Sequence, residues 1–76
     1  MNIPADLEHT EVLAEDVRKG DFLWLHECVA VKQPVRVTQV LDRVKGKVTF
    51  VCRNDEENQQ VTTCGTRGEP MTRIIQ

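Results

Sequence analysis

The side chains best suited to hold a metal ion are one histidine and three cysteines. His26 and Cys28 lie two positions apart, so on a strand both would point to the same side. Cys52 and Cys64 would join them if their strands paired suitably, and zinc accepts such sulfur and nitrogen ligands. Structural zinc sites usually draw on close Cys-x-x-Cys pairs, whereas these thiols are scattered. We therefore expect free thiols and no metal, with a structural zinc-binding domain as an alternative.

The same residues include the types that a nucleophilic site needs, but the sequence does not show that they meet in space. Cys28 with His26 or His9 would supply a nucleophile and a base, and Asp16 or Asp21 an orienting carboxylate. Triads are defined by geometry rather than by inventory, and a chain of 76 residues offers little room for a substrate cleft. No glycine-rich loop of the phosphate-cradling kind occurs. We expect no catalytic residues, no cofactor and no enzymatic activity.

Charge is distributed unevenly along the chain. Residues 1–27 have a net charge of −5, residues 28–53 of +5, and residues 54–76 of −2. Two hypotheses follow: the basic segment pairs with the acidic N-terminal segment, or it offers a basic face to an acidic protein surface or to nucleic acid phosphates. The basic side chains of the hypothetical face are Arg36, Arg43, Lys45, Lys47 and Arg53.

The elements that must position these side chains are short strands. Eleven Val, three Ile and seven Thr favour a pleated sheet, and no long run has helical spacing. The clearest pattern is a β-hairpin over residues 35–53, with its turn at Lys45-Gly46 and a bulge where alternation breaks at Thr38-Gln39. Further strands are expected at residues 10–14, 22–26, 59–64 and 71–75, with a loop at residues 65–70.

These short strands predict an all-β fold, namely a small SH3-like barrel of five or six antiparallel strands. Closure of the barrel would remove exposed strand edges. An OB-like barrel is the alternative, although it normally needs a longer chain and often a helix. Residues 1–9 are expected to form a flexible arm or one helical turn, and residues 10–76 a single domain.

The apolar segment around Trp24 is the second candidate for an interface. Phe22, Trp24 and His26 would share one face of the strand, and Trp24 is expected in the core because it lies in the most apolar strand. The opposite face would then offer an outward apolar patch or a dimer interface. Its side chains would be Leu23, Leu25, Val29 and Val31.

Two stretches resemble known β modules. Residues 14–22 (AEDVRKGDF) look like the polar turn, Gly-Asp and strand entry of many SH3-like and Hint-like modules. The hairpin, the strand that follows it and the glycine-rich loop are similar to small SH3-like proteins of actinobacteria and their phages. The resemblance covers about two-thirds of the chain and is one of rhythm rather than of signature residues. It implies a fold and, by analogy, binding to a host or phage protein.

The expected function is therefore that of a non-catalytic binding module, a small phage or bacterial protein that binds another protein. A nucleic-acid-binding barrel that uses the basic hairpin is the first alternative. No secretory signal opens the chain, no apolar run is long enough to span a bilayer, and the cysteines are odd in number. We expect a cytoplasmic location, no membrane partner, and either a monomer or a homodimer.

Overall fold

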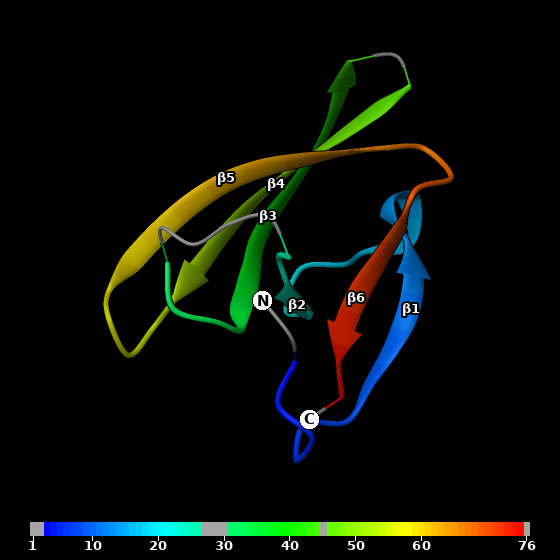
Figure 1. The fold of residues 1–76 in the computed structure, drawn as a ribbon. Coiled ribbons are helices and arrows are strands. Elements are labelled where there is room, and N and C mark those ends of the chain that lie inside the picture. The colour runs from blue at the N-terminus through cyan, green and yellow to red at the C-terminus, as the bar shows by residue number, and fades with distance from the viewer. Residues whose placement is uncertain (1–2, 27–30, 45, 76) are drawn as a thin grey trace.

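The fold is a single antiparallel sheet of six strands, described here from a computed structural model for residues 3–26, 31–44 and 46–75. The sheet order is β1-β6-β2-β3-β4-β5, and the sheet curves into a barrel-like shape (Figure 1). A three-residue 3-10 turn, η1 (Ala14–Asp16), is its one helical element among the described residues. The predicted all-β fold is confirmed. The strands are β1 (His9–Leu13), β2 (Phe22–Trp24), β3 (Val35–Val44), β4 (Lys47–Asn54), β5 (Gln59–Thr66) and β6 (Pro70–Ile74).

The predicted hairpin is formed by β3 and β4. Alternate side chains of β4 are buried, because every second residue of a strand points to the same face. The register shifts by one residue between Val37 and Gln39, which confirms the predicted bulge. The extra residue returns Val40 to the face of the sheet that carries Val35 and Val37. The bulge therefore keeps the apolar side chains of β3 on the core side.

The core lies on the concave side of the sheet, and its largest fully buried side chains are Phe50 and Leu23. Trp24 is 6% exposed, so its expected place in the core is confirmed. The expected outward apolar patch is wrong, because Leu23 is 0% exposed and Leu25 8%. Successive residues of β2 point to opposite faces, and both Leu23 and Trp24 are buried, so both faces of this strand are covered. Val31 is buried too, and Val29 lies outside the described residues.

Among the described residues, five pairings join the six strands, and no sixth pairing closes the sheet into a barrel. β1 and β5 are the two edges of the sheet order, so the expected removal of all strand edges is wrong. The chain after β1 instead packs against the end of β5: a Cβ on Gly65 would lie 3.0 Å from Ala14 Cβ, and Ala14 N donates to Glu69 O at 2.9 Å. This contact joins one corner and leaves the rest of β5 as a strand edge.

Several boundaries differ from those predicted. β1 begins at His9, so that residue belongs to the sheet and not to the arm, and Leu7 N donates to Pro4 O in a turn before it. β2 ends at Trp24 rather than at residue 26. β5 continues through Gly65, which was expected in a loop, because Gly65 still pairs with Val48 of β4. The absence of a side chain there lets Ala14 pack beside the strand. Among the described residues, no helix has the length and apolarity needed to cross a membrane.

Candidate functional site: a hollow beside the free edge of β3

Two of the predicted basic residues are paired with a carboxylate at the base of the hairpin. Arg36 donates from Nε and from Nη2 to the two carboxylate oxygens of Asp55, at 2.9 and 3.0 Å. Arg53 Nε lies 3.6 Å from Asp55 Oδ1. The hydrogen bond and the positive charge of Arg36 lower the pKa of Asp55, and the same hydrogen bond raises the pKa of Arg36. These two arginines therefore already have an anionic partner within the chain.

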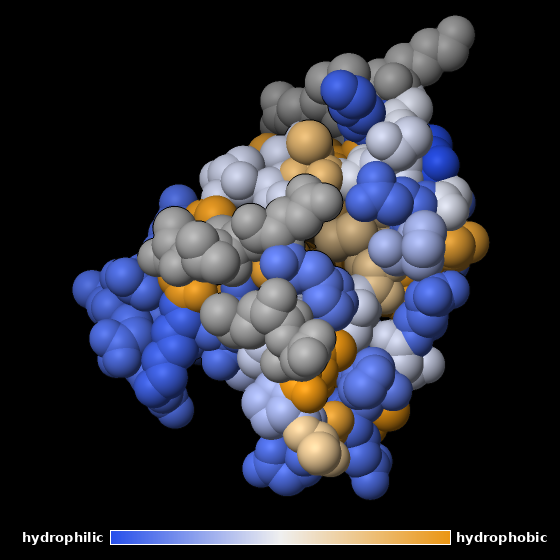
Figure 2. Space-filling model, viewed as in Figure 1, coloured by the Kyte–Doolittle hydropathy of each residue, from blue (hydrophilic) through white to orange (hydrophobic). Residues whose placement is uncertain are grey.

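That partner comes from the β4–β5 turn and not from the acidic N-terminal segment. The turn is held by Asn54, which is buried and donates from Nδ2 to Lys32 O at 2.7 Å. Asn54 Oδ1 also accepts from Glu57 N at 2.9 Å. Hydrophilic side chains gather over this turn, at the left of the view in Figure 2. The expected pairing of the hairpin with the N-terminal acids is replaced here by a pairing with Asp55, because the hairpin base and the turn are adjacent.

The remaining basic residues do not form a described face with these two. Lys47 is exposed at the start of β4 and makes no ion pair with a described residue. The side chain of Arg43 and the whole of Lys45 lie outside the described residues. Of the basic side chains that the structure describes, those of Arg36 and Arg53 lie at the base of the hairpin and that of Lys47 at its distal end.

The residues considered for zinc are also separated. Cys52 is fully buried on the inner face of β4, whereas Cys64 is exposed on β5. His26 Nε2 lies 2.9 Å from Thr72 Oγ1, within hydrogen-bond distance, and Cys28 lies outside the described residues. Across residues 3–26, 31–44 and 46–75, no group of three or more His, Cys, Asp or Glu side chains is placed to hold a metal ion.

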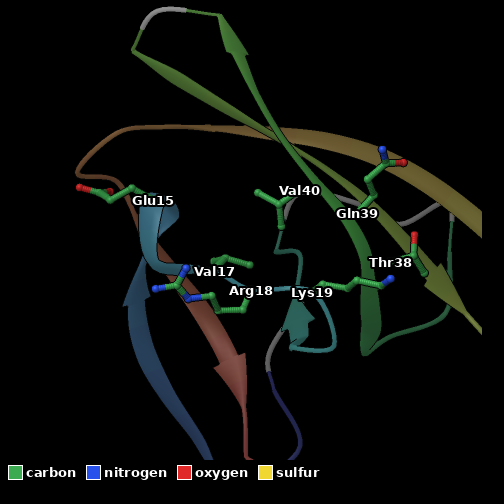
Figure 3. Close-up of a pocket in the computed structure, with 7 residues that line it drawn as sticks. All are labelled: Glu15, Val17, Arg18, Lys19, Thr38, Gln39 and Val40. Atoms are coloured by element: carbon green, nitrogen blue, oxygen red, sulfur yellow. The ribbon is translucent and has the colours of Figure 1, made fainter.

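A different group of side chains surrounds an open hollow of about 610 Å³. One wall is the loop before β2, and the other is β3 just beyond its bulge. Val17 and Val40 lie on opposite sides of the hollow, and Lys19 extends toward β3 (Figure 3). Arg18 and Lys19 are exposed and make no ion pair with a described residue. The lining residues are Glu15, Val17, Arg18, Lys19, Thr38, Gln39 and Val40.

Two backbone hydrogen bonds fix the loop against β3. Gly20 N donates to Val37 O, and Val37 N donates to Asp21 O, both at 2.8 Å. Gly20 has a φ of 97°, a conformation that side-chain-bearing residues rarely adopt. Asp21 Oδ2 also accepts from Arg18 N at 2.9 Å, which closes the turn that presents the two basic side chains. The loop is therefore anchored at the bulge, and its basic residues project beside it.

Beyond that anchor, β3 has no neighbouring strand on the side of the hollow. The pairing with β2 includes only Val35 and Arg36, and the loop takes both backbone groups of Val37. From Gln39 onward, the described residues provide no strand opposite β4, and the hairpin extends past the end of β2 (Figure 1). A free strand edge, two basic side chains and the side chains of Val17 and Val40 thus lie together.

The acidic residue of the hollow is held at its rim. Glu15 Oε1 accepts from Gly68 N at 2.8 Å, and this hydrogen bond lowers the pKa of Glu15. Its carboxylate is therefore bound to the β5–β6 turn rather than to the basic loop. Thr38 Oγ1 donates to Val51 O at 3.0 Å, so this hydroxyl stabilises the bulge. Of the charged residues that line the hollow, Arg18 and Lys19 are therefore left facing solvent.

The sequence did not predict this site, because residues 15–21 were interpreted only as a polar turn. The available signal was a pair of adjacent basic residues inside a segment with seven acids. No family model, curated protein or solved structure matches the chain.

Proposed function

We propose that this protein is a non-catalytic binding module that takes an extended, acidic segment of another protein at the hollow. The observation that carries the proposal is the unpaired edge of β3 beside Arg18 and Lys19, neither of which has an ion-pair partner among the described residues. An extended peptide can add to a free strand edge through its main chain, while side-chain pockets supply specificity. The half-buried Val40, beside the buried Val17, would contact an apolar side chain of the segment, and the two bases would contact its carboxylates.

Protein is favoured over nucleic acid for two reasons. Barrels that bind single strands usually stack bases on exposed aromatic side chains, but Trp24 and Phe50 are buried and Phe22 is half-buried. Arg36 and Arg53, which would contribute to a phosphate-binding face, are paired with Asp55. A nucleic-acid-binding barrel therefore stays the second candidate. The same proposal includes the resemblance to SH3-like proteins of actinobacteria and their phages, a cytoplasmic location, and a host or phage protein as the partner.

The proposal is tested by selecting extended peptides from a displayed random library on the wild-type protein. We expect acidic sequences with alternating apolar residues to be enriched. Arg18→Glu and Lys19→Glu should each weaken the selected peptides by about tenfold, because each replaces an attraction with a repulsion. Lys47→Glu is the matched control, since it makes the same charge change outside the hollow, and it should alter affinity less than about twofold.

Three results would contradict the proposal. Selected peptides that show no excess of acidic residues would remove the charge argument. Loss of binding in Lys47→Glu with retention in Arg18→Glu would move the site to the distal end of the hairpin. Tight binding of a single-stranded oligonucleotide, with a steep loss on adding salt, would support the nucleic-acid alternative instead.

A further inference from the structure

We infer that the edge of β5 pairs antiparallel with β5 of a second copy of this chain, which joins two sheets into one. This inference goes beyond the proposed peptide site and rests on a different edge. β5 is the last strand in the sheet order, and its one strand partner is β4. β4 therefore satisfies one side of β5, and the other side has no strand partner among the described residues.

β5 lacks the devices by which proteins normally protect such an edge. Those devices are short length, charged side chains, proline and bulges. β5 has eight residues, Gln59–Thr66, with no charged residue and no proline, and it pairs with β4 along its whole length without a register shift. The other edge strand, β1, is shorter and contains Glu11. A long, regular and neutral edge is a template for another strand.

The backbone of β5 is oriented for this pairing. Both backbone groups of Val37 are bonded to the loop, so the neighbouring residue Arg36 directs its groups toward β4, where it lies opposite Arg53. The backbone N–H and C=O groups of Arg53 thus point toward β3. Those of its partner on β5, Gln60, point away from β4. Alternation then directs the N–H and C=O groups of Thr62 and Cys64 outward as well. Their side chains are also exposed.

The ends of β5 are complementary when the strands run in opposite directions. Beside Gln59, the exposed carboxylates of Glu56 and Glu57 share the ammonium group of Lys32, at 3.3 and 3.8 Å. At the opposite end, Lys47 lies in register with Thr66 and makes no ion pair with a described residue. In an antiparallel pair, the Gln59 end of β5 in one copy lies near the Thr66 end of β5 in the other. The group of Glu56, Glu57 and Lys32 has one negative charge in excess, and the Lys47 of the second copy would bring a positive charge near it. With a neutral strand between, this arrangement favours a second copy as the occupant.

The geometry limits the register. A two-fold axis perpendicular to the sheet keeps the outer faces of the two copies on the same side. Residues whose side chains point to the same face must therefore lie opposite each other. The longest such registers place the axis at Thr62 or Thr63. With the axis at Thr62, this residue lies opposite Thr62 of the second copy. With the axis at Thr63, the two Thr62 residues lie diagonally, about 7 to 8 Å apart. In both, the two side chains at position 62 are neighbours.

The experiment is sedimentation equilibrium of the full chain, with a reductant, from micromolar to millimolar concentration. We expect a reversible dimer in the wild type. Thr62→Lys should raise its dissociation constant at least about tenfold, because like charges become cross-strand neighbours. Thr10→Lys is the matched control: it makes the same change at an exposed position of the other edge strand, β1, and should leave the dimer unchanged.

A rescue distinguishes loss of pairing from loss of folding. Thr62→Lys and Thr62→Glu should each be monomeric with wild-type circular dichroism, and their mixture should form a heterodimer. A wild type that stays monomeric at all concentrations, a dimer that survives Thr62→Lys, or a mixture that stays monomeric would each overturn the inference. Because β3 and β5 lie on opposite sides of β4, peptide binding at the hollow is measured separately and does not depend on this result.

Discussion

The two ends of the β3–β4 hairpin are built from similar residues but have different surroundings. At the base, the inner side chains of Val37 and Cys52 are fully buried, and the outer arginines are paired with Asp55. Toward the distal end, Leu41 is half-buried, Lys47 has no ion pair with a described residue, and β3 has lost its neighbour β2. The comparison teaches that hydrophobicity and charge along a strand do not define its role. The neighbours that the fold supplies decide whether a segment stabilises the domain or is available to a partner.

The largest expected effect comes from removing a core side chain on the inner face of the hairpin. Phe50→Ala should lower the free energy of unfolding by about 3 to 5 kcal/mol, because Phe50 is fully buried and a cavity would remain. Leu41→Ala, at the next pair along the hairpin and half-buried on the outer face opposite Thr49, should lower it by about 1 kcal/mol or less. Urea unfolding followed by circular dichroism measures both. Equal losses in the two variants would show that the two faces of the hairpin do not differ in burial.

An intermediate effect is expected at the turn that supports the base. Asn54→Ala should cost about 1 to 3 kcal/mol, because Lys32 O and Glu57 N lose their partner in a buried position. Asn58→Gly is the control in the same turn: Asn58 has a φ of 53° and is exposed, and glycine adopts this conformation readily. Thermal unfolding should therefore separate the two variants clearly. A neutral Asn54→Ala would mean that the turn does not need this side chain.

The smallest effect is expected from Asp55→Asn, and it depends on pH. The pKa of Asp55 is lowered in the folded protein, so its pairing stabilises the fold above the unfolded pKa of about 3.9. That stabilisation is lost as the pH falls through the folded pKa. The wild type should therefore be slightly more stable than the variant at neutral pH, and the difference should vanish in acid. Glu15 has the same sign of shift, so only the difference between the two proteins isolates Asp55.

The Asp55 comparison is checked by thermal unfolding of both proteins between neutral pH and pH 2. High salt should reduce the difference, because the pair is exposed and screened. A difference that grows in acid would have the wrong sign for a carboxylate with a lowered pKa. Such a result would mean that the arginines at the base are not held by Asp55 as described.

The sequence by itself determined the all-β fold, the hairpin and its bulge. Val35, Val37 and Val40 break the two-residue period once, and a strand whose apolar face must meet the core can absorb that extra residue only by bulging. Such alternation is a local property of the backbone, so a single stretch of sequence contains it.

The tertiary structure alone decided which charges are available and where the strand edges lie. Arg36 meets Asp55, and Lys19 lies beside Thr38, each across 19 positions of sequence. Gly65 lies in a strand opposite Val48, and Ala14, far away in the chain, fills the space where a side chain would be. These contacts depend on how the strands are ordered and how the sheet curves. Local periodicity contains no information about that order, and hence none about the hollow or the edge of β5.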